Sequence, residues 1–247
     1  MSEQQQMQQF EGELGQIPAS ILQILGVEIP EFVPPPIYDV TEPFIAAGVD
    51  RIVLVVIDNF GLFEVTYHKP EKIISNSSAL VLLSTKNPYT LGMFHQVMYG
   101  GFEHEPNNFH LLRYLNQHRK ATAFVGREKD LNRYDGGTKS FAKKEDIKTW
   151  VEAARVINRH HLSILHFLDF EAIHRNRSLN SEQSENLMNK LINRTDKWIG
   201  TMIQQLRERS MMIILGNHGR YKIDLEYSGK IGQWRQASVP LALLIHK

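Results

Sequence analysis

The stretch Arg51–Gly61, RIVLVVIDNFG, decides the fold. Its first seven residues include six of Ile, Leu and Val, and they run directly into Asp58 and a glycine-containing turn. A continuous run of this kind is typical of a strand buried on both faces, as in a parallel sheet. Open α/β sheets bind ligands beyond the carboxyl ends of their strands, where Asp58 falls. The same aspartate could instead cap the following helix, and the run alone does not separate the two interpretations.

The composition narrows the class of protein. With 247 residues, 42% of them hydrophobic and 22% charged, the chain is expected to form one large or two small globular domains. A net charge of +1 and a pI near 8.0 give no broad field for a nucleic acid polymer or an acidic membrane. Cysteine is absent, so any metal site must use the nitrogen and oxygen ligands of His, Asp and Glu. No apolar run approaches the ~20 residues of a membrane span, and we expect a cytoplasmic protein.

The N-terminal part of the chain reads as an extension of one main domain. Residues 1–13 are polar and Gln-rich, which predicts a frayed tail. The segment 17–26, IPASILQILG, has helical spacing with proline at its start and glycine at its end. Prolines make residues 28–36 an extended connector. We therefore assign residues 1–49 to a tail, a short helix and a Pro-rich connector, and residues 50–247 to a single α/β domain.

Strands and helices alternate along that domain. Further apolar strands are predicted at 78–83, 121–125, 162–168, 211–215 and 238–245. Helical spacing falls at 91–99, 109–118, 144–159 and 182–209, whereas 126–141 lacks periodicity and reads as a loop. Pro240 indicates that the last strand lies at an edge or has the proline in its first turn. The pattern predicts a three-layer α/β sandwich with a mostly parallel central sheet flanked by helices.

Polar side chains follow four of these strands. In a parallel sheet the strand ends share one edge, so the side chains should converge, and carboxylates, imidazoles and a hydroxyl together suit divalent cations. A hydroxyl near a helix N-terminus, such as Thr90, is usually an N-cap, yet a helix N-terminus also stabilises an anion. The four sets are Asp58; the hydroxyl segment Ser84–Thr90; Asp169, Glu171 and His174; and Asn217 with His218.

Taken together, these segments resemble the alkaline phosphatase superfamily. The residues that carry the resemblance are VLVVI before Asp58, Pro88-Tyr89-Thr90 before a helix, LLRYLNQHRKATAFVG, LHFLDFEAIH, and DKWIGTMIQQLRERSMMIILGNHG. The similarity is strongest to the nucleotide pyrophosphatase/phosphodiesterase-like branch, with cofactor-independent phosphoglycerate mutases as more distant relatives. The resemblance covers nearly the whole chain. Each motif is short and degenerate, so the specificity of the resemblance comes from the order and spacing of the motifs.

The resemblance implies a role for each candidate residue. Asp58 would be the first metal ligand, and Thr90 the nucleophile and a ligand, with Thr85 and Ser84 as alternative nucleophiles. Two divalent cations about 4 Å apart would clamp the attacking and leaving oxygens. The remaining ligands implied are Asp169 (alternatively Glu171) with His174, and His218 with Asn217. The metal expected is Zn or Mn, with Mg as a further candidate.

Three departures from the family pattern weaken these sites. Asn217 stands where the family has an aspartate, the Asp169-to-His174 spacing is one residue longer than usual, and Gly232–Gln236, GQWRQ, lacks the last histidine. One ion rather than two could therefore be bound. We derive two hypotheses: a metal-dependent phosphoric-ester hydrolase, phosphodiesterase-like, that acts on a phosphorylated small molecule or nucleotide; or a catalytically impaired relative that binds a phospho-ligand or a protein.

Overall fold

The computed structural model describes residues 7–85, 89–176, 180–216 and 240–247. Within them one sheet of eight strands runs through the molecule in the order β1-β3-β8-β7-β2-β6-β4-β5. All neighbouring strands are parallel except β8, which is antiparallel to both β3 and β7. The strands are β1 Gln8–Glu13, β2 Arg51–Ile57, β3 Ala79–Ser84, β4 Thr122–Gly126, β5 Lys139–Ala142, β6 Leu162–Phe167, β7 Ser210–Gly216 and β8 Leu241–His246.

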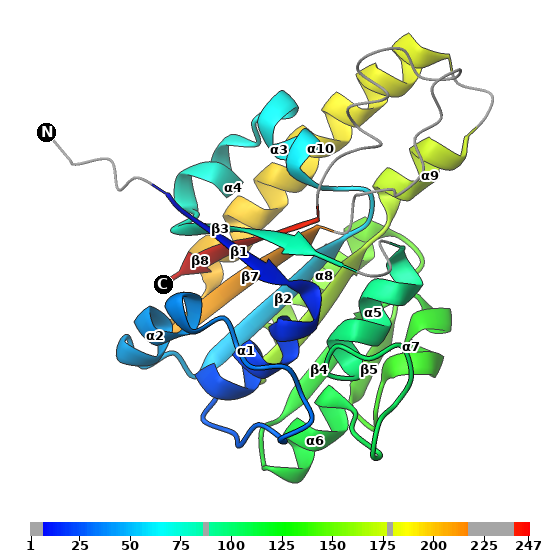
Figure 1. Ribbon diagram of the computed structural model, residues 1–247. Coiled ribbons are helices and arrows are strands. Elements are labelled where there is room, and N and C mark those ends of the chain that lie inside the picture. The colour runs from blue at the N-terminus through cyan, green and yellow to red at the C-terminus, as the bar shows by residue number, and fades with distance from the viewer. Residues whose placement is uncertain (1–6, 86–88, 177–179, 217–239) are drawn as a thin grey trace, which may run out of the picture.

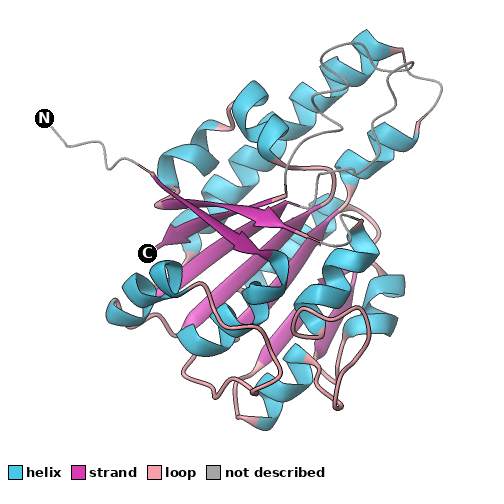
Figure 2. Ribbon diagram, viewed as in Figure 1, coloured by secondary structure: helices cyan, strands magenta, loops and turns pink. Residues whose placement is uncertain are grey.

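Helices cover both faces of the sheet, which gives three layers (Figure 2). The α/β sandwich predicted from the sequence is therefore confirmed. The helices are α1 Ile17–Ile24, α2 Tyr38–Ala46, α3 Leu62–His68, α4 Glu71–Asn76, α5 Thr90–Met98, α6 Leu111–Gln117, α7 Glu128–Tyr134, α8 Asp146–Val156, α9 Asp169–Arg175 and α10 Ser181–Gln205, with a short 3-10 turn at Leu14–Gln16. In the part of the chain that the structure describes, no helix is long and apolar enough to cross a membrane.

Strand β2 lies between β6 and β7 and is buried from Ile52 to Ile57. Its side chains alternate between two hydrophobic clusters. Ile52, Leu54 and Val56 belong to the cluster formed with α1, α2, α5 and α6, whereas Val53, Val55 and Ile57 belong to the cluster formed with α4, α8 and α10. These two sets of helices lie on the two faces of the sheet (Figure 1). Because both faces are covered, the strand needs no polar alternation, which is why it reads as a continuous apolar run.

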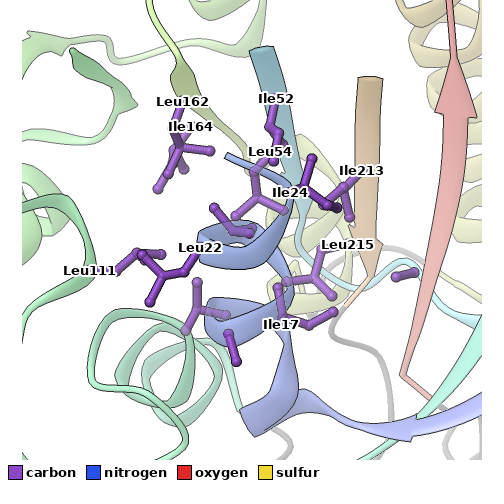
Figure 3. Close-up of a cluster of buried hydrophobic side chains, with 14 of the residues drawn as sticks. Ile17, Leu22, Ile24, Ile52, Leu54, Leu111, Leu162, Ile164, Ile213 and Leu215 are labelled. Carbon is purple, nitrogen blue, oxygen red and sulfur yellow. The ribbon is translucent and has the colours of Figure 1, made fainter. Parts of the chain in front are cut away.

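The short helix α1 packs directly on the sheet. Its residues Ile17, Leu22 and Ile24 lie against side chains of β2, β6, β7 and α6 (Figure 3). Leu22 is fully buried. The N-terminal segment thus shares its core with the strands and contributes to one layer of the sandwich. The neighbouring side chains in the close-up are Ile52, Leu54, Leu111, Leu162, Ile164, Ile213 and Leu215.

Two local predictions were wrong. Residues 8–13, expected to fray, form β1 and pair with β3. Their side chains are mostly exposed, so the strand depends on backbone hydrogen bonds and has no apolar signature. The expected loop 126–141 contains α7 and the first residues of the edge strand β5. Of the two alternatives for the last strand, the structure agrees with a proline at its start: β8 lies between β3 and β7, Pro240 directly precedes it, and the carbonyl of Pro240 accepts from Leu83 N at 2.9 Å.

Glycine is required at the carboxyl end of β7. A Cβ built on Gly216 would lie 2.0 Å from the carbonyl oxygen of Phe60. No side chain fits at that distance, so the turn after β2 can pass over the end of β7 only at a glycine. Gly216 is paired in register with Ile57, and this close approach fixes the backbone beside Asp58.

Candidate functional site

The candidate site lies where β2 and β6 end side by side. Ile57 is in register with Phe167, and the amide of Asp58 donates to the carbonyl of Phe167 at 3.1 Å. The Asp58 side chain is fully buried. It does not cap α3, because that helix has Gly61 as its N-cap and the amide of Gly61 is bound by Glu64 at 2.9 Å. A carboxylate buried in this way needs a hydrogen-bonding or charged partner.

Thr90 contacts this carboxylate. Its Oγ1 donates to Oδ1 of Asp58 at 3.0 Å across 32 positions of sequence. Thr90 is the first residue of α5, whose N-cap is Tyr89, so its hydroxyl does not serve as the N-cap. The two alternative hydroxyls make other contacts: Ser84 Oγ lies 3.4 Å from the carbonyl of Gly12, and Thr85 Oγ1 accepts from Gln96 Nε2 at 3.0 Å. The Thr90 hydroxyl is therefore a hydroxyl at this sheet edge that is bonded to Asp58.

A buried histidine stands on the other side of Asp58. His166 Nε2 lies 3.5 Å from Asp58 Oδ1, and Nδ1 lies 3.1 Å from Asp130 Oδ2. Burial lowers the pKa of His166, but the charge of Asp58 and the hydrogen bonds to both carboxylates outweigh burial and raise the pKa to about 9. The imidazole is thus a cation at neutral pH, enclosed between two carboxylates.

Arg127 continues this chain of charges. Its Nε donates to Asp130 Oδ2 at 3.0 Å, and its Nη1 lies 3.5 Å from Glu171 Oε2. Burial would raise the pKa of Asp130, but the bonds from His166 and Arg127 lower it below its ordinary value. The sequence interpretation missed His166 and Asp130. The signal for the first is a lone histidine inside the apolar strand, LHFL.

The carboxylates that begin α9 are bound by arginines. Asp169 Oδ2 accepts from Arg194 Nη2 at 2.8 Å. The guanidinium of Arg194 lies over the ring of Trp198 at 4.2 Å, and Trp198 is stacked on Trp150 with the ring planes 9° apart. Glu171 is the acid already placed beside Arg127. Asp169 and Glu171, the two alternative ligands of the second metal, thus both have arginine partners.

Asp146, at the start of α8, fixes the backbone of the same turn. It accepts from the amides of Leu168 at 2.8 Å and Asp169 at 2.9 Å. Burial raises the pKa of Asp146 to about 6, although those two bonds and Arg194 oppose the rise. The position of Asp169 is therefore set through its backbone by Asp146 and through its side chain by Arg194.

The remaining predicted ligands are not all described. His174 lies in α9, but its side chain is outside what the structure describes, and Asn217, His218 and Gly232–Gln236 fall in the segment 217–239, also outside it. Among the described side chains, no group of three or more His, Asp and Glu is arranged to hold a metal ion. Asp58 and Thr90 offer two oxygens that fit a hard cation. Asp169 and Glu171 do not fit as ligands while arginines hold them.

The fold has known counterparts. No family model matches the chain, and no curated protein matches its sequence significantly. The structure is similar to an alkaline phosphatase superfamily protein from Vibrio parahaemolyticus, with a TM-score of 0.53 and 10% identity over 81% of this chain and 60% of that one. It is also similar to the lipoteichoic acid synthase LtaP from Listeria monocytogenes, with a TM-score of 0.56 and 14% identity over 92% and 70%.

The chain therefore has the fold of the alkaline phosphatase superfamily, as its resemblance implied. A murine ectonucleotide pyrophosphatase/phosphodiesterase 5 also aligns, at a TM-score of 0.46 and 12% identity over 71% of this chain and 59% of that one. That likeness is too distant to assign the branch. The chain spans 60% of the Vibrio protein, so the activity of the longer proteins does not transfer to it directly.

Proposed function

We propose that the chain is a phosphoric-ester hydrolase of the phosphodiesterase type with Thr90 as its nucleophile. The observation that carries this proposal is the 3.0 Å hydrogen bond from Thr90 Oγ1 to Asp58 Oδ1. A threonine hydroxyl is a weak nucleophile at its ordinary pKa, and it needs an adjacent base or metal to become reactive. The buried Asp58 is such a neighbour, and the fold supports the reaction class.

The position of Thr90 at the start of α5 also favours phosphoryl chemistry. The first amides of an α-helix have no partner within the helix, and the helix dipole places partial positive charge at this end. Phosphoryl oxygens beside Thr90 would therefore meet backbone donors. The imidazolium of His166, 3.5 Å from Asp58, offsets the negative charge that the carboxylate and the phosphoryl group bring together.

The reaction proceeds in two displacements. Thr90 Oγ1 attacks phosphorus as its proton passes to Asp58, and the bond to the leaving oxygen breaks. The leaving group takes a proton from solvent. Water then attacks the phosphorus of the threonyl intermediate, which is a phosphothreonine from a monoester and still carries the second ester group from a diester. The attacking water loses one proton to solvent, the bond to Thr90 Oγ1 breaks, and Asp58 returns a proton to that oxygen. Each step is an in-line displacement in which one oxygen–phosphorus bond forms while another breaks.

A divalent cation, Zn or Mn with Mg as a further candidate, is proposed as the cofactor. Asp58 and Thr90 are the described residues that would hold it, together with His218 and Asn217 as the resemblance implies. When bound, such an ion polarises a phosphoryl oxygen and lowers the pKa of the hydroxyl. The substrate we propose is a phosphorylated small molecule or a nucleotide, and the location is the cytoplasm.

Thr90→Ala tests the nucleophile. We expect purified protein supplied with Zn²⁺ or Mn²⁺ to hydrolyse bis-p-nitrophenyl phosphate, and the variant to lose turnover while its circular dichroism is unchanged. Thr85→Ala is the matched control, because it also removes a hydroxyl near β3 but one that contacts Gln96. Mass spectrometry of acid-quenched enzyme should find the p-nitrophenyl phosphoryl group on the peptide that contains Thr90. Turnover retained in Thr90→Ala would sink the assignment.

A catalytically impaired protein that binds a phospho-ligand or a protein is the second candidate. The specific observation in its favour is that Asp169 and Glu171 are paired with arginines. The two functions differ in one measurement. An impaired protein would give neither turnover nor a phosphothreonine but would still bind a nucleotide such as AMP in isothermal titration calorimetry, whereas the hydrolase gives both chemical signals.

A further inference from the structure

We propose that Arg194 and Arg127 take the place of a second metal ion, so that the site holds at most one divalent cation. This inference concerns the site of the proposed function but does not depend on turnover. It starts from the first turn of α9, which carries the two acids that could have bound a second ion. Each acid has a guanidinium within ion-pair distance, at 2.8 Å for Asp169 and 3.5 Å for Glu171.

The guanidinium of Arg194 is fixed in place by more than one contact. It donates to Asp169, lies 3.9 Å from Asp146 Oδ2, and stacks at 4.2 Å on the face of Trp198. Trp198 is itself stacked on Trp150 at 5.3 Å between ring centroids. A cation–π contact with a planar guanidinium and a charge-assisted hydrogen bond act together here. These contacts together stabilise the ion pair between Arg194 and Asp169.

Arg127 is fixed in a similar manner on the other side of the turn. It bonds Asp130, which in turn bonds His166, and it lies close to Glu171. Burial would lower the pKa of Arg127, but the bond to Asp130 and the nearby acids raise it above the ordinary value. The Arg127 guanidinium is therefore charged at neutral pH.

Placing a divalent ion at this turn would break both arrangements. A carboxylate oxygen of Asp169 would have to exchange its bond with Arg194 for the metal, and two like charges would then lie within a few ångströms of each other. The positive charge that a second ion would bring beside α9 is already supplied by the arginines. Asp169 and Glu171 are therefore partners of arginine and not metal ligands.

Metal content tests this inference without any activity measurement. Wild type, Asp169→Asn and Glu171→Gln are equilibrated with Zn²⁺ or Mn²⁺, separated from free metal by gel filtration, and assayed by inductively coupled plasma mass spectrometry. We expect no more than one equivalent per chain in wild type, and the same count in both variants. Two equivalents in wild type, or an equivalent lost in either variant, would overturn the proposal.

Removing the guanidinium gives the converse test. Arg194→Met should free Asp169 and bind one equivalent more than wild type, and the added equivalent should be absent from the Arg194→Met/Asp169→Asn double variant. Arg207→Met, at an exposed arginine just after α10, is the matched control and should leave the count unchanged. If Arg194→Met binds the same number of metal equivalents per chain as wild type, Arg194 does not take the place of a second metal ion. Circular dichroism confirms that each variant is folded.

The outcome is separable from that of the proposed function. Failure of Thr90→Ala to abolish turnover refutes the nucleophile and leaves the metal count untouched. Loss of metal in Asp169→Asn refutes the present inference and leaves the role of Thr90 standing. Thermal melts add a second readout: the rise in Tm on adding Mn²⁺ should be equal in wild type and Asp169→Asn, because bound ligand stabilises only through its own site.

Discussion

His166 Nδ1 donates to Asp130 Oδ2 at 3.1 Å, and His166 Nε2 lies 3.5 Å from the Asp58 carboxylate that accepts from Thr90. Because the pKa of His166 is raised to about 9, its proton stabilises the folded state. That contribution is complete below the unfolded pKa near 6.5 and is lost as the pH rises through 9. We expect the free energy of unfolding, from urea titrations, to fall by up to about 3 kcal/mol between pH 6.5 and 10.

Asp130→Asn is the control for this alkaline loss. The amide keeps the shape of the carboxylate but removes one of the two negative charges that raise the pKa of His166. The alkaline decline in stability should therefore be smaller in the variant and should end at a lower pH. Identical pH profiles for wild type and Asp130→Asn would mean that Asp130 does not hold the imidazole proton.

The burial of His110 predicts that the free energy of unfolding falls as the pH is lowered. The residue is 3% exposed, and both ring nitrogens lack a hydrogen-bond partner within the described structure. Burial, followed by the charge of Arg113, lowers the pKa of His110 to about 4. A histidine that must stay neutral contributes stability above its unfolded pKa of about 6.5, and this is lost as the pH falls towards 4. The contribution at stake is about 3 kcal/mol.

The comparison variant is His110→Leu, which fills a similar volume and does not titrate. Between pH 6.5 and 4 the stability of wild type should fall more steeply than that of the variant, as measured by urea unfolding at each pH. Other acids that titrate in this range affect both chains equally, so the difference isolates His110. Parallel curves would show that the imidazole can take up a proton in the folded protein.

The sequence predicts the central strands because their signal is local. Strand β2 is apolar over six consecutive residues, and its burial on both faces is a direct consequence. The contact between Asp58 and Thr90 could also be anticipated, since each follows a strand of one sheet. Strand β1 could not, because an edge strand with exposed side chains is stabilised by backbone pairing, and backbone pairing leaves no pattern in the side chains.

The rest of the site depends on contacts between distant segments. His166 looks like one more residue of an apolar strand until Asp130, 36 positions away, is brought beside it. Arg194 looks like a solvated residue on the polar face of α10, and its bond to Asp169 exists only because α9 and α10 pack together. A motif search identifies the acids but not the cations opposite them, because an ion pair between distant segments leaves no local pattern in the sequence.

Gly216→Ala should destabilise the protein severely. The added Cβ would fall 2.0 Å from the carbonyl oxygen of Phe60, and a backbone atom cannot move aside as a flexible side chain can. Overpacking of this kind costs about 1–3 kcal/mol and occasionally more. We expect a lower midpoint in urea, or insoluble protein, and weaker contact between Thr90 and Asp58.

Gly26→Ala is the matched control for Gly216→Ala. Its φ is +65°, but nothing lies within 4 Å of the added Cβ. Only the left-handed backbone conformation is penalised there, at about 1–2 kcal/mol. A Gly216→Ala chain no less stable than Gly26→Ala would show that the turn after β2 can move away from β7.

Asp58→Asn should impair phosphoryl transfer, and it should also lower stability at neutral pH because the charge of Asp58 helps raise the pKa of the buried His166. The asparagine can still accept from Thr90 Oγ1, but it neither takes up the hydroxyl proton nor offsets the charge of His166. We expect kcat to fall roughly 100-fold or more, by analogy with the removal of a single electrostatic group from an active site, while KM changes little. Asp50→Asn is the control at the other end of β2, where the carboxylate pairs with Arg51 and Arg209 and should not affect the rate. Equal kcat values for Asp58→Asn and Asp50→Asn would contradict a catalytic role for Asp58. They would show that the Asp58 carboxylate affects the rate no more than the Asp50 carboxylate at the other end of β2.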